Sequence, residues 1–213
     1  MNTVIKSKTH LFKILILFMV FQPLVLFGQS QVLKIDEPGL AFSGSRIFGK
    51  NIQGFGYQFA FSKSGASDIG FSYQRAIVEE GTKKNWDFYS LFLRLHPGKE
   101  KTNRVLQPFL TLEYVKVGSE KHISGFGFEI GAYKIFNENQ SVGFMPMVSC
   151  AISLLEAQVD LNTDLLSESV GFAGGLGILF YMPDNNVIQV LPSYSISDAV
   201  SSFDISIALL VRI

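Results

Sequence analysis

Two histidines follow residue 30, and histidine is the side chain most suited to acid–base catalysis near neutral pH. His122 lies two residues after Glu120, and His96 precedes a Pro-Gly pair. A hydrolase of the triad type needs a nucleophile, a base and an orienting group together. Neither histidine has a Ser-x-His or Gly-x-Ser-x-Gly sequence beside it. We therefore expect solvated turn histidines and no catalysis, with Glu120 and His122 as the only pair worth changing.

The sequence also contains no motif for binding a metal, a cofactor or a nucleic acid. There is no metal-ligand spacing and no phosphate-binding loop, so no cofactor and no metal is expected. The 18 basic residues balance the 18 acidic ones, and three of the basic but none of the acidic residues lie before residue 31. A nucleic-acid partner is not expected, because it would require a basic field. Cys150 is the single cysteine, which excludes an intrachain disulfide.

Four charged residues lie within apolar stretches instead of loops: Arg94, Glu113, Glu129 and Arg212. All four fall on the less apolar side of a two-residue alternation. Carboxylates and guanidinium groups pair well in a narrow interior. We predict that these four form a polar cluster inside a barrel, with a narrow ion path as a secondary possibility.

Residues 203–213 show the alternation that must position these charges. Their odd-numbered members are all apolar, whereas the even-numbered ones include Asp204, Ser206 and Arg212. Successive side chains of a strand point to opposite faces, so one face of this strand is wholly apolar. The same period recurs from about residue 40. It predicts ten strands, near residues 40–48, 52–61, 68–75, 87–96, 106–116, 125–132, 143–152, 170–180, 187–196 and 203–213.

The first of these strands is the weakest, because the link at residues 49–51 is very short for an outer loop. Eight strands are the alternative count. Links at residues 62–67, 136–140 and 182–186 are short and rich in turn residues. Links at residues 76–86 and 154–167 are longer and are the expected surface loops. The second is acidic, and its contact candidates are Glu156, Asp160 and Asp164, beside Glu120 and His122 in the link at residues 117–122.

Residues 1–30 read as a secretory signal peptide. Lys6, Lys8 and Lys13 precede an apolar run from residue 14 to 27, which ends in Gly-Gln-Ser. The run is short of the roughly 20 residues of a spanning helix. We expect cleavage after Ser30 or Gly28, and a single domain over residues 31–213.

Gly, Ser and Ala dominate the less apolar face, whereas rings lie near the strand ends of the apolar face, which favours lipid outside. The alternative is an exported soluble β-sandwich or lipocalin-like binding protein, with its apolar face inside. The stretches GFGYQFAF and GFGFEIGAYKIF, the leader and the last strand together resemble the small outer-membrane β-barrel family of Gram-negative bacteria. Family members often end in an aromatic residue, whereas this chain ends in Ile213.

That resemblance implies an all-β, closed, antiparallel up-and-down transmembrane β-barrel in the outer membrane. Its implied partners are outer-membrane lipid and the barrel-insertion machinery, which would engage the last strand. A structural or surface-interaction role is expected. Some small barrels are lipid-modifying enzymes, so that activity is the catalytic alternative.

Overall fold

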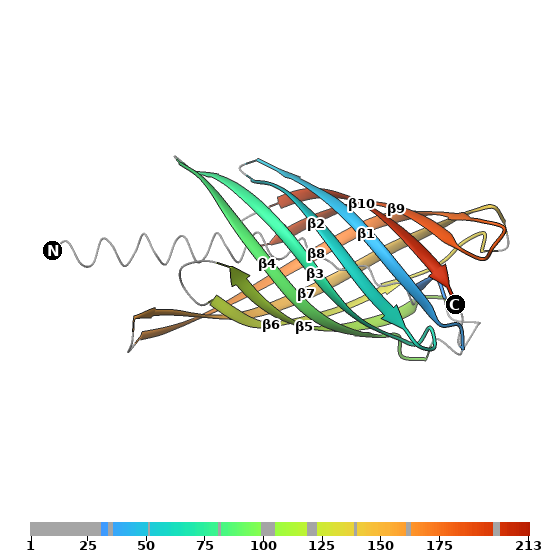
Figure 1. Cartoon of the computed structure of the whole chain (residues 1–213), viewed down its shortest axis with the longest axis horizontal. Helices are drawn as coiled ribbons and strands as arrows, with labels where there is room; N and C mark the ends of the chain where they lie inside the picture. The colour runs from blue at the N-terminus through green and yellow to red at the C-terminus, as the bar shows by residue number, and fades with distance from the viewer. Residues whose placement is uncertain are drawn as a thin grey trace.

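The computed structural model describes residues 31–33, 36–50, 52–80, 82–98, 105–118, 123–138, 140–160, 163–197 and 201–213. The expected leader, residues 1–30, lies outside this set. Ten strands follow one another: β1 Gly39–Gly49, β2 Ile52–Ser62, β3 Ser67–Glu80, β4 Thr82–Leu95, β5 Gln107–Gly118, β6 Ile123–Tyr133, β7 Val142–Asp160, β8 Thr163–Tyr181, β9 Val187–Ser197 and β10 Ser201–Arg212. All are strongly tilted to the long axis of the molecule (Figure 1).

The strands close into one antiparallel barrel in which each strand pairs with its sequence neighbours and β1 pairs with β10. The weak first hairpin is present in full, from Gly39 opposite Ser62 to Gly49 opposite Ile52. Closure runs from Gly39 opposite Arg212 to Gly49 opposite Ser202. The prediction of a closed up-and-down barrel with ten strands is therefore confirmed, and the count of eight is wrong.

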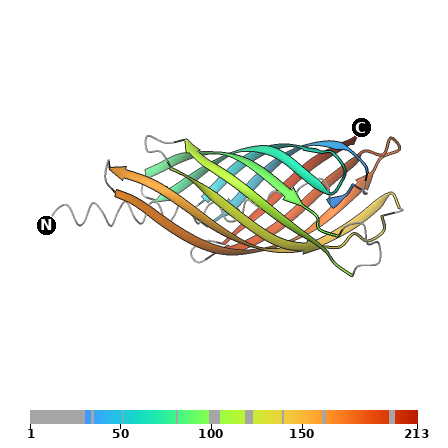
Figure 2. The ribbon, with the colours of Figure 1, turned by 90° about the horizontal axis from the view of Figure 1, so that it is seen from below.

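Two expected surface loops are strands instead. Pairing of β3 with β4 continues to Glu80 opposite Thr82, and pairing of β7 with β8 continues to Asp160 opposite Thr163. In a two-stranded ribbon, the backbone donors and acceptors on the facing edges of the two strands pair with each other. Pairing can therefore continue beyond the barrel wall. The prediction of longer outer loops at residues 76–86 and 154–167 is therefore corrected to paired strands. Both hairpins project at the end opposite the C-terminus (Figures 1 and 2).

Short turns connect β2 to β3 and β8 to β9 at the other end. Met182 and Asn186 close one of them, with the Met182 amide donating to the Asn186 carbonyl at 2.9 Å. Asn185 in this turn and Asn137 in the turn before β7 have φ near +60°. Asparagine tolerates this left-handed conformation better than most residues. The turn residues thus fix this end of the barrel, as the sequence predicts.

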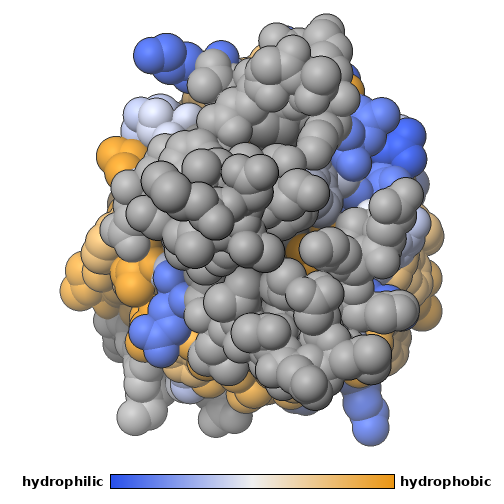
Figure 3. Space-filling view, turned by 90° about the vertical axis from the view of Figure 1, so that its left-hand side faces the viewer, coloured by the Kyte–Doolittle hydropathy of each residue, from blue (hydrophilic) through white to orange (hydrophobic). Residues whose placement is uncertain are grey.

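The apolar side of each strand faces outward. On β8, Phe172 is 63% exposed, whereas Leu179, seven residues along and on the opposite face, is 0% exposed. Seen along the barrel from the hairpin end, hydrophobic side chains lie around the flanks (Figure 3). A soluble sandwich or lipocalin-like barrel would bury this face. The arrangement contradicts that alternative.

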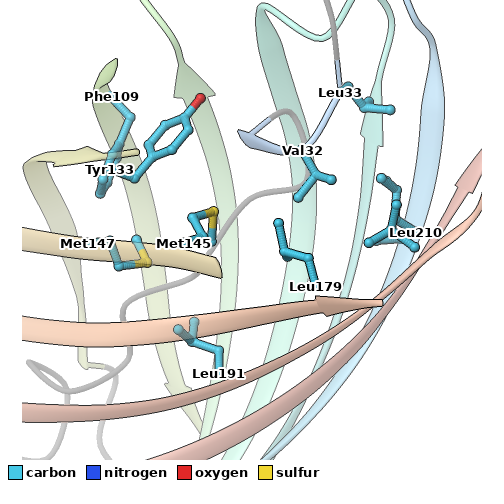
Figure 4. Close-up of a cluster of buried hydrophobic side chains, with 11 residues drawn as sticks. Val32, Leu33, Phe109, Tyr133, Met145, Met147, Leu179, Leu191 and Leu210 are labelled. Carbon is cyan, nitrogen blue, oxygen red and sulfur yellow. The ribbon is translucent and has the colours of Figure 1, made fainter. Parts of the chain in front are cut away.

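An apolar cluster fills the interior at the end of the barrel where β1 begins and β10 ends. Val32 and Leu33, from the segment before β1, pack there with inward side chains of several strands (Figure 4). The other members are Ala41, Phe109, Tyr133, Met145, Met147, Leu179, Val187, Leu191 and Leu210. This mouth of the barrel is therefore occupied by the chain itself.

Candidate functional site

A row of polar side chains crosses three neighbouring strands inside the barrel. Arg94 on β4 is opposite Thr111 on β5, and Thr111 is opposite Glu129 on β6. Arg94 Nε donates to Thr111 Oγ1 at 2.8 Å, and Arg94 Nη2 lies 3.2 Å from Glu129 Oε2. Thr111 Oγ1 donates to the same Glu129 oxygen at 3.1 Å. The alternation of three strands thus assembles one buried hydrogen-bonded ion pair.

Glu113 lies two residues beyond Thr111 on the same face of β5, and Ser90 on β4 donates a hydrogen bond to it. The guanidinium of Arg94 also lies 5.1 Å from the centre of the Phe109 ring. Three of the four residues expected to form the interior cluster therefore line adjacent strands. The ion pair in this group is that between Arg94 and Glu129.

Arg212 is not part of this row. Its Nη1 lies 3.5 Å from Glu37 Oε2, at the mouth where the barrel strands begin and end. Both residues flank the β1–β10 seam, since Arg212 is opposite Gly39. The sequence places Arg212 on the correct face, but the tilt of the strands carries it to the mouth. Its inclusion in one cluster with Arg94, Glu113 and Glu129 is corrected accordingly.

His96 differs from the solvated turn histidine that the sequence predicts. Its side chain is fully buried, its Nδ1 is 3.3 Å from the Tyr133 hydroxyl, and its Nε2 is 4.0 Å from Asp68 Oδ2. Its ring also packs edge-on against that of Tyr133, at 5.7 Å between centres. The signal was available, because position 96 continues the inward alternation of Arg94 beyond the end of β4. The Pro-Gly pair after His96 obscured it.

Asp204 is a further inward carboxylate, which the sequence pattern alone did not distinguish. It lies on β10, opposite Ile47 of β1 and Ser193 of β9, and is 6% exposed. Its Oδ1 has no hydrogen-bond partner among the residues that the structure describes. A buried acceptor of this kind needs a polar partner such as water or a cation. Asp204 is therefore a buried carboxylate with an acceptor atom available for a further polar partner.

The structure describes only some of the contact residues that the sequence predicts in the outer loops. Glu120 and His122 lie outside the described residues. Glu156 is exposed on the outward face of β7. Asp160 and Asp164 lie on the two strands of the β7–β8 hairpin, where Asp160 is opposite Thr163 and Gln158 is opposite Asp164.

Within the described ranges, no group of three His, Cys, Asp or Glu side chains is placed to hold a metal ion. None of the helices formed by the described residues combines the length and the apolar character needed to cross a membrane.

Comparison of structures identifies the architecture. The translocator domain of the autotransporter NalP from Neisseria meningitidis aligns with 86% of this chain and 91% of its own, with a TM-score of 0.51 and 11% identity. The fold is that of an outer-membrane β-barrel. Neisserial surface protein A aligns with 83% of the chain and 97% of its own, at TM-score 0.38 and 14% identity. No protein-family model and no curated protein matches the sequence.

Outer-membrane barrels show one apolar band around the outside, and in this barrel two aromatic residues lie on the outward face of β3 and β4 where polar residues begin. Tyr73 and Tyr89 are opposite each other on β3 and β4, with ring centres 5.3 Å apart. Two residues farther toward the hairpin tip on each strand, Arg75 Nε lies 2.7 Å from Asp87 Oδ1. Rings followed by an ion pair are the order of side chains expected across a membrane interface.

Proposed function

We propose that this chain is an integral outer-membrane protein that displays the β3–β4 and β7–β8 hairpins at the cell surface as contact elements, without catalysis. The observation that supports this most directly is the combination of an outward apolar band with two ribbons that extend beyond their neighbours. The apolar band would contact membrane lipid, and the two ribbons would extend from the membrane as surfaces for binding a partner.

The β7–β8 hairpin is the longer projection. Among the described residues, positions 163–170 of β8 pair only with β7, and pairing of β8 with β9 begins at Gly171 opposite Ser197. The β3–β4 hairpin repeats this on a smaller scale, since residues 82–86 of β4 precede the first β5 pair, Asp87 with Gly118. Within the part of the chain that the structure describes, both hairpins therefore continue as two-stranded ribbons beyond the paired ends of their neighbours.

The longer ribbon carries acidic residues. Glu156 and Glu168 are exposed at its base, and Asp160 and Asp164 lie toward its tip. Carboxylates gathered on one projection attract cationic groups and repel anionic ones. A partner with basic side chains therefore suits this surface best.

The membrane part of the proposal is tested by cell fractionation with an electrophoretic heat-shift assay. A folded outer-membrane barrel gives a band in the outer-membrane fraction that shifts on boiling. Recovery in the soluble periplasmic fraction without a shift contradicts the proposal.

The surface part is tested by labelling intact cells with a membrane-impermeant maleimide. Asp160→Cys, made in a Cys150→Ser background, should be labelled on intact cells. Asn185→Cys, in the turn at the opposite end, is the matched control and should be labelled only after the membrane is opened. Labelling of Asn185→Cys alone on intact cells contradicts the display of the hairpins.

The absence of catalysis is tested by replacing the one candidate pair. Glu120→Ala and His122→Ala should leave the extracted outer-membrane lipids unchanged. A loss of one modified lipid species in either variant would support the lipid-modifying alternative instead.

A further inference from the structure

The inner wall of the barrel is divided into a bulky half and a small half. On β4 to β6 the inward side chains include Phe92, Arg94, Phe109 and Tyr133. On β8, β9, β10 and β1 they are mostly small, as with Gly171, Ala173, Ser193, Ser206, Ser43 and Ser45. Bulky side chains fill a narrow barrel, whereas glycine, alanine and serine leave space beside the wall. The free space therefore lies off-centre, along the small half.

A small cavity lies against this half. Ala41, Ser43 and Gln58 line it from β1 and β2, and Gln189, Ala208 and Leu210 line it from β9 and β10. Its polar lining can hold water, because side-chain amides and a hydroxyl supply hydrogen bonds there. Val32 from the segment before β1 lies on the same cavity.

The charge along the interior is negative. Among the inward strand side chains that the structure describes, Asp68, Glu113, Glu129 and Asp204 are carboxylates, whereas Arg94 and Arg212 are the only arginines or lysines. Arg94 already pairs with Glu129. Asp204 lies on β10, across the barrel from Glu113 on β5, since β1 to β4 separate them on one side and β6 to β9 on the other. Carboxylates on opposite walls attract cations and exclude anions.

Residues 31–33 close the other end of this space. Val32 is 2% exposed and Leu33 is 1% exposed, and both pack in the apolar cluster with Leu179 and Leu210 (Figure 4). Gln31 is fully buried, yet its Nε2 and Oε1 have no hydrogen-bond partner among the described residues. An unsatisfied buried amide opposes burial, so the apolar contacts of Val32 and Leu33 must offset its cost.

We propose that the barrel interior is a cation-selective passage along its small-residue wall, with Asp204 as a selectivity residue and residues 31–33 as a gate at the terminal mouth. Cations enter when Val32 and Leu33 leave the apolar cluster. The passage is distinct from the surface role of the hairpins, which lie at the opposite end.

The gate is tested by recording current through planar bilayers that contain the purified full-length protein in potassium chloride. Val32→Asp with Leu33→Asp should raise the time spent open by about tenfold or more, because isolated carboxylates cannot remain in an apolar cluster. Val32→Ile with Leu33→Ile is the control at the same positions and should behave as the parent protein. If the acidic variant gives no heat-shifted band and is therefore not folded, Val32→Ala with Leu33→Ala takes its place. This variant should also open the gate, because it removes apolar contacts.

Selectivity is tested in the open variant under a potassium chloride gradient. The reversal potential should have the sign of cation preference, and Asp204→Asn should move it toward zero. Asp87→Asn, which changes an outward carboxylate, is the matched control. Ser206→Phe should reduce the current, whereas Ile207→Phe on the lipid side should not.

Two results overturn the proposal. A folded gate variant that gives no more current than the parent protein excludes a gated passage. A current that prefers anions, or whose reversal potential Asp204→Asn leaves unchanged, excludes the assigned selectivity.

Discussion

Arg94 Nη2 lies 3.2 Å from Glu129 Oε2 across an intervening strand, with Thr111 hydrogen-bonded to both residues. The Arg94 side chain is fully buried, and that of Glu129 is nearly so. Neither residue is close to the other in sequence, and only the matched registers of β4, β5 and β6 join them. The pair therefore reports directly on correct strand alignment.

Glu129→Ala should destabilise the barrel strongly. It leaves the Arg94 guanidinium buried without its carboxylate, which typically costs about 3–5 kcal/mol. The free energy of unfolding in urea, measured in lipid vesicles, checks this. Glu168→Ala, at an exposed position of β8, should change it little. Equal effects of the two substitutions would show that the pair does not contribute.

A joint replacement separates the charge from the shape. Arg94→Met with Glu129→Leu should recover most of the stability lost in Glu129→Ala, because apolar pairs of similar volume often replace buried ion pairs at little cost. The same urea titration measures it. If the double variant is as unstable as Glu129→Ala, the hydrogen bonds to Thr111 contribute more than the charge pairing does.

Alternation in the sequence was sufficient to predict the barrel, the inward faces and the closing pair β1–β10. It could not predict the two long hairpins, because polar residues after position 76 and acidic residues after position 154 are typical of loops as much as of free ribbons. His96 shows a second limit. A Pro-Gly pair predicts a turn, but the direction of the preceding side chain depends on how far the β4 alternation persists.

The Tyr133 hydroxyl contributes to the buried group around His96. Tyr133→Phe removes its contact with His96 Nδ1 at 3.3 Å. The expected loss of unfolding free energy is about 1 kcal/mol, the usual net value of one hydrogen bond. Tyr194→Phe, on the outward face of β9, is the matched control and should have almost no effect. A larger effect at Tyr194 would reverse the assigned faces.

Gly131 is required by close packing inside β6. A Cβ at this position would lie 2.6 Å from the Val148 carbonyl oxygen and would also overlap the Phe109 ring. Gly131→Ala should therefore cost about 1–3 kcal/mol, as overpacked substitutions do. Gly127→Ala, on the same face of the same strand, meets its nearest atom at 3.6 Å and should be tolerated. Urea unfolding of both variants checks the difference, and equal tolerance would contradict this packing.

Ile207 tests whether lipid covers the outward face of β10. It is 56% exposed and points away from the interior. In a membrane, Ile207→Arg should cost about 2–4 kcal/mol if the position is near the bilayer midplane, because a guanidinium there is poorly solvated. In water, the same change on an exposed surface would cost almost nothing. Glu156→Arg, on the exposed base of the β7–β8 hairpin, is the control and should be neutral in lipid vesicles. A neutral Ile207→Arg in the same assay would place this face in water, and the outward apolar band would then need another partner.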